Sequence, residues 1–201
     1  MSKVQENKKK KKESLFNTAY ELFTTKGIQK TAISDIVEKA GVAKGTFYLY
    51  FTDKYDLRNK LISHKAGELF SAANKKLVKE QVTGVEEQII FIVNYIIDYL
   101  NANRSLLNFI SKNLVWGIFR NTLNIPADDS DLNFYDIYLK MLAEDECGYE
   151  EPEVMLFTII ELTGSTCYNS ILYNEPLSID KYKPYLFRTI RLIIKSHKIN
   201  N

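Results

Sequence analysis

The 201 residues suffice for one large domain or two small ones, and a hydrophobic content of 45% excludes a wholly disordered chain. With only 8 glycines and 4 prolines, the chain has too few turn residues for an all-β protein, so we predict an all-α fold. The net charge is +2, but residues 1–60 carry 13 basic and 7 acidic residues, which indicates a polyanionic partner for this part.

The N-terminal part reads as a tail followed by two short helical stretches. Residues 1–12 contain the run Lys8–Lys12, and we expect a basic disordered tail there. Apolar residues then recur at helical spacing from Leu15 to Phe23. Thr31 can cap the next helix, which is short. We predict a separate helical module over residues 13–60.

The stretch Lys44–Phe51, KGTFYLYF, has the composition of a β-strand, but no partner strand is apparent in the chain. As a helix, it places Phe47 and Phe51 on one face, toward the preceding helices. Gly41 supplies the tight turn before it. The segment is therefore predicted to be the second helix of a helix-turn-helix.

The remainder of the chain is also predicted to be helical. A fourth helix, capped by Thr52 or Asp53, is expected from Lys54 to Lys79. A loop is expected over residues 121–131. Pro152 and Pro184 are each expected in the first turn of a helix. The later helices are expected over residues 85–100, 104–119, 132–143, 152–173 and 184–197.

Two lysines lie where a helix prefers negative charge. Lys44 and Lys54 fall in the first turns of their predicted helices, and a cation there costs about 0.3–1 kcal/mol. A bound anion such as DNA phosphate reverses the sign of this effect. The alternative is that both ammonium groups point into water.

Residues Thr31–Leu57, TAISDIVEKAGVAKGTFYLYFTDKYDL, closely resemble the DNA-binding signature of the tetracycline-repressor (TetR) family. The resemblance covers about residues 14–60, and it departs at Ala43, where many members carry a capping Ser or Thr. It implies an all-α fold in which an N-terminal three-helix helix-turn-helix module is joined by a long helix to a helical ligand-binding and dimerisation domain. That second domain would cover residues 61–201.

The resemblance also implies roles for individual residues. Phosphate contacts are implied for Thr31, Tyr48, Tyr50 and Lys54. Contacts with base edges are implied for Lys44, Gly45 and Thr46, with Leu49 against a thymine methyl group. For the two tyrosines the alternative is core packing with the hydroxyl at the rim.

The family's C-terminal body dimerises and binds a small effector. The stretch Val154–Tyr173 is apolar around most of its circumference, which indicates burial on two sides. The predicted dimer residues are Gly164, Ile171, Leu186, Ile190 and Ile194. An intramolecular core would explain the same pattern.

A ligand pocket is predicted from aromatic residues that combine bulk with polar tips, although such residues also build ordinary cores. The predicted ligand-binding residues are Phe91, Tyr95, Tyr99, Trp116, Phe119, Glu161 and Tyr168. Glu161 stands alone in an apolar stretch, where it would meet either a cationic ligand or a buried basic partner.

Together these features predict a homodimeric transcriptional repressor that a small-molecule effector releases from a palindromic operator. A transcriptional activator and a helical interaction protein remain as alternatives. We expect no enzyme, cofactor or metal site, because no catalytic or metal-ligand constellation surrounds His64, His197, Cys147 or Cys167. A signal peptide and a membrane-spanning run are not apparent, so a cytoplasmic location is expected.

Overall fold

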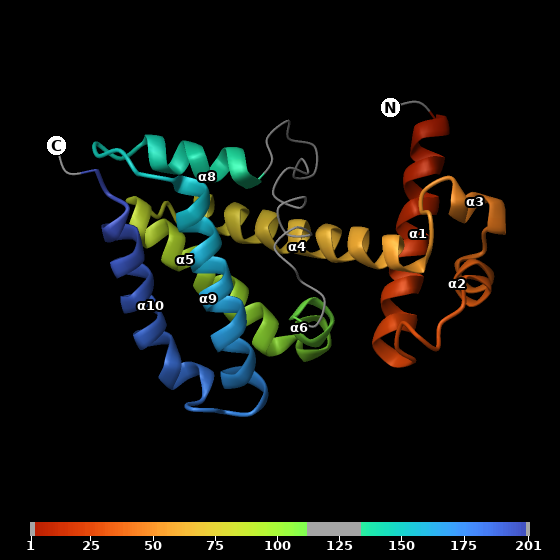
Figure 1. Ribbon diagram of the computed structural model, residues 1–201. Coiled ribbons are helices and arrows are strands. Elements are labelled where there is room, and N and C mark those ends of the chain that lie inside the picture. The colour runs from red at the N-terminus through yellow and green to blue at the C-terminus, as the bar shows by residue number, and fades with distance from the viewer. Residues whose placement is uncertain (1–2, 112–133, 200–201) are drawn as a thin grey trace. The chain divides into compact units, whose positions relative to one another are not determined.

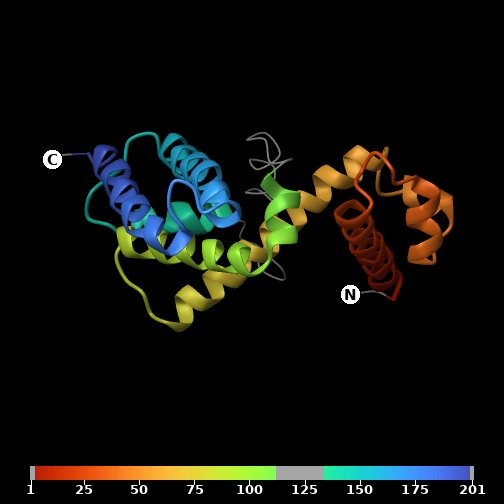
Figure 2. The ribbon, with the colours of Figure 1, turned by 90° about the horizontal axis from the view of Figure 1, so that it is seen from below.

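The computed structural model describes residues 3–111 and 134–199, and every regular element in these ranges is an α-helix (Figures 1 and 2). Within the described residues the only β-type pairing is an isolated antiparallel bridge between Tyr149 and Lys198. The chain divides into two compact units, residues 1–64 and 65–201. The all-α prediction is confirmed.

The first unit contains α1 (Lys3–Thr25), α2 (Ile33–Ala40), α3 (Lys44–Tyr48) and the start of α4 (Lys54–Lys79). Its core is aromatic between α1, α3 and the segment that joins α3 to α4. The Phe51 ring lies 5.5 Å from both the Phe16 and the Phe47 ring, measured between centroids. Phe47 is 0% exposed and Phe51 2% exposed, as the helical reading of KGTFYLYF requires.

The start of α2 differs from the prediction. Ala32, not Thr31, precedes the helix, and its N–H donates to Asp35 Oδ2 at 3.3 Å. Thr31 instead turns its hydroxyl back toward the preceding loop. The end of α2 follows the prediction, because Gly41 adopts a left-handed conformation with φ of +67° and begins the turn to α3.

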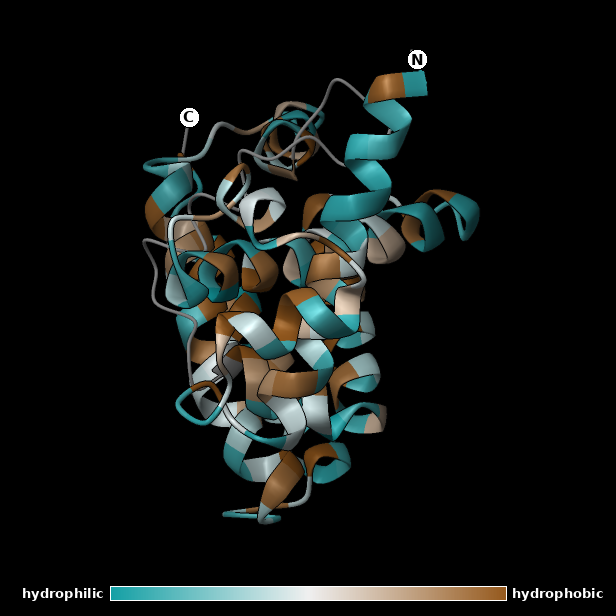
Figure 3. Ribbon diagram, turned by 90° about the vertical axis from the view of Figure 1, so that its right-hand side faces the viewer, coloured by the Kyte–Doolittle hydropathy of each residue, from teal (hydrophilic) through white to brown (hydrophobic). Residues whose placement is uncertain are grey.

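The segment expected to be a disordered tail is helical. α1 begins at Lys3, so residues 3–12 form its first turns, and all of these side chains are exposed. In Figure 3 this end of α1 is mostly hydrophilic. Local interactions support the helix here, including an ion pair between Lys10 Nζ and Glu6 Oε1 at 2.7 Å.

The second unit holds the rest of α4 together with five further helices. These are α5 (Val85–Ala102), α6 (Arg104–Ser111), α8 (Phe134–Ala143), α9 (Pro152–Leu172) and α10 (Ile179–Ser196). They enclose one apolar core to which α5, α9 and α10 contribute most of the buried aliphatic residues. α9 and α10 pack side by side (Figures 1 and 2).

Two helices of this unit depart from the prediction. α10 begins at Ile179, so Pro184 is an interior residue rather than part of the first turn. Ile179 is buried, and its burial extends the helix toward the N-terminus. The predicted helix 104–119 is observed as far as Ser111, and the predicted loop 121–131 lies outside the described residues. None of the described helices combines the length and apolar character needed to cross a bilayer.

Candidate DNA-binding surface and ligand cavity

α3 presents a set of exposed side chains on a firmly held backbone. Phe47 is fully buried and fixes the helix against the first unit's core. On the other side Tyr48 is 52% exposed and Leu49, which follows the helix, is 78% exposed. Lys44 and Gly45 are exposed as well, and Thr46 is half-buried. These five residues, which were predicted to contact bases or phosphates, are thus at least partly accessible to a partner.

Thr31 does not fit the phosphate contact implied for it. The side chain is 1% exposed, and its hydroxyl donates to the Gly27 carbonyl oxygen at 2.8 Å. A buried hydroxyl that is already hydrogen-bonded cannot reach a DNA backbone without rearrangement of the loop. In this structure Thr31 stabilises the loop between α1 and α2.

Lys54 is also committed within the protein. Its Nζ donates to the carbonyl oxygens of Ile28, Gln29 and Thr31, at 3.0, 3.2 and 3.1 Å. An ammonium group has three N–H donors, so all of them have acceptors here. The geometry makes Lys54 a cross-link between the start of α4 and the α1–α2 loop, in contrast to the free phosphate contact that was predicted.

Tyr50 packs against α1 and is half-buried. Its hydroxyl donates to the Lys8 carbonyl oxygen at 3.3 Å. The core-rim alternative therefore describes Tyr50 better, whereas the exposed Tyr48 keeps the orientation that a DNA contact needs.

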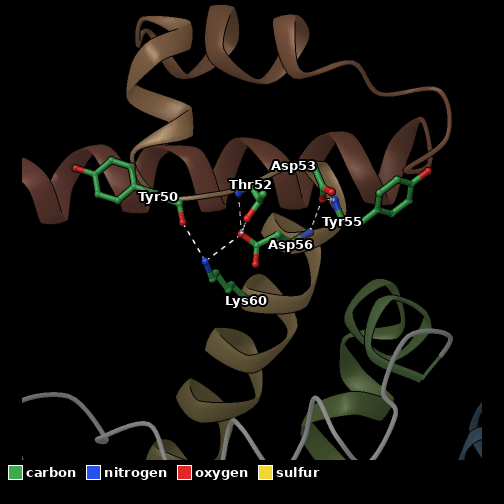
Figure 4. Close-up of polar contacts among 6 residues, drawn as sticks. All are labelled: Tyr50, Thr52, Asp53, Tyr55, Asp56 and Lys60. Atoms are coloured by element: carbon green, nitrogen blue, oxygen red, sulfur yellow. Dashed lines mark hydrogen bonds and ion pairs between the residues drawn. The ribbon is translucent and has the colours of Figure 1, made fainter.

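The start of α4 is fixed by a network of polar contacts (Figure 4). Asp53 Oδ1 accepts hydrogen bonds from the N–H groups of Tyr55 and Asp56, at 2.7 and 2.8 Å, and so caps the helix. Asp56 Oδ2 accepts from the Thr52 N–H at 2.9 Å and from Lys60 Nζ at 3.0 Å. This arrangement confirms Asp53 as the capping residue of the two that were predicted.

The charge of Asp56 is favoured by these contacts. Partial burial raises the pKa of its carboxyl group, but the hydrogen bond from the Thr52 N–H and the Lys60 ammonium outweigh that effect. The pKa consequently lies below its ordinary value. Lys60 also donates to the Tyr50 carbonyl oxygen at 3.0 Å, so the same network holds the backbone that follows α3.

The second unit contains a cavity of about 570 Å³. Its walls are mainly apolar, with Phe70 from α4, Ile92 from α5, Met141 from α8 and Ile159 from α9 among them. Burial raises the pKa of the lining thiol Cys167 to about 12, so this group stays neutral. The volume lies within the range of about 300–1,000 Å³ that is usual for small-molecule sites.

The polar groups of the cavity come largely from α9. They are Glu161, Thr163, Ser165, Tyr168 and Asn169. The Thr163 hydroxyl is buried without a hydrogen-bond partner among the described residues. Tyr168 donates to Asn108 Oδ1 at 3.3 Å. A bound molecule could therefore satisfy Thr163, which a sequence pattern of aromatic residues does not single out.

The structure separates the predicted ligand residues into three groups. Glu161 and Tyr168 line the cavity. Phe91, Tyr95 and Tyr99 do not: Tyr95 stacks on Tyr99, and Lys76 Nζ lies 5.7 Å from the Tyr95 ring centroid. Trp116 and Phe119 lie outside the described residues. Helical spacing alone could not tell which side of α5 faces the cavity.

Most of the predicted dimer residues are buried inside the subunit. Leu186, Ile190 and Ile194 are 1% exposed or less, and Ile171 is 2% exposed. These residues belong to the intramolecular core, which was the alternative explanation. Gly164 alone of the predicted set is exposed.

Other apolar side chains lie on the outside of the same two helices. On α9, Val154 is 48% exposed and Phe157 38% exposed. On α10, Tyr185 is 53% exposed and Leu192 62% exposed. Helical geometry places residues three, four and seven positions apart on one face, so each helix carries an exposed apolar face in addition to its buried one.

The helix-turn-helix geometry has a counterpart among known proteins. Residues 15–61 match the family described as bacterial regulatory proteins, tetR family. The helix-turn-helix module of this chain is therefore of the TetR-family type. An uncharacterized HTH-type transcriptional regulator of Bacillus subtilis, YvdT, is 54% identical over 44 residues, which are 22% of this chain and 23% of that protein.

Two further similarities reach into the second unit of the chain. The fatty acid metabolism regulator protein of Bacillus subtilis is 32% identical over 85 residues, 42% of this chain and 43% of that relative. The match to each of these two relatives thus spans less than half of the relative's length. The crystal structure of the transcriptional regulator FadR from Bacillus subtilis in complex with stearoyl-CoA shares the fold, with a TM-score of 0.61 and 17% identity over 90% of this chain and 96% of FadR.

Proposed function

We propose that this protein is a sequence-specific DNA-binding repressor that works in the cytoplasm. The main support is that Lys44, Thr46 and Tyr48 are accessible on a helix that the buried Phe47 holds in place. In a major groove, a lysine can donate to guanine O6 or N7 and a threonine can donate or accept. A protein bound at an operator obstructs transcription, which makes repression the proposed mode.

Dimerisation is the second part of the proposal. The exposed apolar faces of α9 and α10, defined by Val154, Phe157, Tyr185 and Leu192, are the proposed interface. Two copies would place their α3 helices in successive major grooves, about 34–36 Å apart, on a near-palindromic operator. The interface proposed here replaces the buried residues that the sequence suggested.

The third part is an effector with a largely apolar body. The apolar walls of the cavity support this choice, and FadR, which shares the fold, was crystallised with stearoyl-CoA. The buried Thr163 hydroxyl, which lacks a partner among the described residues, would hydrogen-bond to a polar group of the effector.

The DNA-binding proposal is tested by selecting duplexes from a random-sequence library with the full-length protein. The expected result is a near-palindromic sequence. Lys44→Ala should relax the preference at particular base pairs by about 1–3 kcal/mol, while Lys79→Ala, an exposed lysine of the second unit, should leave the preference unchanged. Recovery of no preferred sequence would overturn the proposal.

The effector proposal is tested by thermal unfolding in the presence of stearoyl-CoA and of uncharged long-chain alcohols. A ligand that binds the native state raises the midpoint. Ile159→Phe narrows the cavity and should reduce that rise, whereas Val78→Phe at an exposed position should not. A rise that Ile159→Phe leaves intact would place the ligand elsewhere.

A further inference from the structure

The first turns of α1 divide their charges between two sides of the helix. Lys8 and Lys11 precede the buried residue Leu15 by seven and four positions, and Lys12 precedes the buried residue Ala19 by seven. At 100° per residue they continue the face that α1 turns toward the core of the first unit. Lys12 Nζ accordingly lies 5.4 Å from the centroid of the Phe16 ring. Beyond the core this face is exposed and basic.

The other side of the same turns is close to neutral. Glu6, Lys9, Lys10 and Glu13 are among the residues that line a surface groove there. Lys10 pairs with Glu6, and Glu13 Oε2 lies 3.5 Å from His64 Nε2. The segment with the five-lysine run, expected from sequence to be a basic disordered tail, therefore has one basic side and one side whose charges are balanced.

The basic side is tied to the helix proposed to read DNA. Tyr50 lies two residues after α3, and its hydroxyl donates to the Lys8 carbonyl oxygen at 3.3 Å. Figure 4 shows the Tyr50 side chain lying along α1. The contact holds the first turns of α1 next to the end of α3, within a single compact unit.

We propose that Lys8, Lys11 and Lys12 form a second phosphate-binding surface, which contacts the DNA backbone beside the groove that α3 enters. The proposal rests on the proposed function. At 1.5 Å per residue, the ten residues 3–12 extend α1 by about 15 Å, and duplex DNA carries one charge per roughly 1.7 Å of axis. Several phosphates are thus within the length of the surface.

The partner is DNA rather than a lipid bilayer. A helix that lies on a membrane needs an apolar face opposite its charges, and residues 3–12 contain Val4 as their only large apolar side chain. A polyanion suits the segment for another reason. Cations near the start of a helix oppose its dipole, and bound phosphate removes this opposition.

The experiment compares two triple variants of the full-length protein that lose the same charge from the same helix. One is Lys8→Gln/Lys11→Gln/Lys12→Gln. The matched control is Lys3→Gln/Lys9→Gln/Lys10→Gln. Circular dichroism first checks that both retain the helical content and the thermal midpoint of the wild type. Binding is then measured across salt concentrations, with the selected operator and with an unrelated duplex.

The first variant should lose affinity for both duplexes by the same factor, roughly tenfold per contact at about 0.1 M salt, and its salt slope should fall by about 0.9 per contact. The control should keep most of the wild-type slope. If both triple variants lowered the salt slope equally, the effect would come from the charge of the segment as a whole and not from the side formed by Lys8, Lys11 and Lys12. The proposal would then be wrong. It would fail also if neither triple changed the slope. If the wild-type protein bound the selected operator and the unrelated duplex equally well, the proposed function itself would be overturned. That result is seen without either variant, so it can be distinguished from the two outcomes above.

Discussion

At the scale of single residues, Lys44 and Lys54 show how one residue type takes two roles in one module. Both lie at a helix start, and from sequence both appear suited to bind phosphate. Lys44 is exposed on α3. Lys54 donates to three carbonyl oxygens of the α1–α2 loop. Sequence could not distinguish them, because the carbonyl groups come from residues 23 to 26 positions earlier in the chain.

The two lysines should therefore respond differently to removal. Lys54→Ala leaves three loop carbonyls without their donor and should lower the free energy of unfolding by about 1–3 kcal/mol. The DNA affinity of Lys54→Ala should depend on salt concentration with the same slope as that of the wild type. Lys44→Ala should leave stability within about 0.5 kcal/mol, as is usual for exposed positions. Urea unfolding together with salt-dependent binding measures both effects, and a slope change in Lys54→Ala would restore its role as a phosphate contact.

Asp56 gives a prediction about pH. Its folded-state pKa is lowered, so its carboxylate contributes stability above the unfolded pKa, and the contribution is lost as the pH falls through the folded pKa. Asp56→Asn should cost about 0.5–1 kcal/mol at pH 7 and should show a smaller loss of stability in acid than the wild type. Asp180→Asn, in an exposed first turn, is the control. Parallel acid profiles for wild type and Asp56→Asn would contradict the assignment.

At the scale of elements, α9 is apolar on two sides for two different reasons. Ile159 and Cys167 face the interior and the cavity, while Val154 and Phe157 face outward. The sequence predicted burial on both sides of this helix. It could not assign residues to sides, because an apolar stripe that meets a neighbouring helix and one that meets a second subunit have the same composition.

The dimer prediction can now be tested without disturbing the core. Leu192→Glu places a charge on the exposed face of α10 and should convert dimers to monomers in sedimentation experiments at micromolar concentration. Val78→Glu is the matched control, because Val78 is similarly exposed on α4. Ile190 is unsuitable for this purpose, since a charge at a fully buried position would unfold the subunit. If Leu192→Glu remained dimeric, this face of α10 would not be the interface.

At the scale of the whole molecule, the succession of helices was largely predictable, whereas the sites were predictable only in part. α4 was predicted with its observed bounds, because Asp53 caps its start and its apolar residues keep a helical period. The cavity depends on how five helices pack, so neither Thr163 nor Phe70 stood out in sequence. The motif in α3 was recognisable because its residues are consecutive.

The continuity of α4 leads to a prediction about regulation. The helix begins at Lys54 in the first unit, and further along Ala66, Leu69 and Phe70 line the cavity. An effector that contacts these residues acts on the helix that carries the Asp53 and Asp56 network next to α3. If filling the cavity weakens operator binding, then operator binding must weaken effector binding by the same factor, about 5–150-fold for couplings of 1–3 kcal/mol.

The effector is one found by the thermal-unfolding screen, and its affinity is measured by calorimetry with and without the selected operator. Phe70→Leu keeps the wall apolar but alters the contact with α4, so it should reduce the coupling factor more than it reduces effector affinity itself. Ile92→Val, on α5, is the control, since it trims the same cavity at a helix that does not enter the first unit. Equal effector affinity with free and operator-bound protein would show that α4 does not transmit the signal, because reciprocity leaves no other outcome for coupled sites.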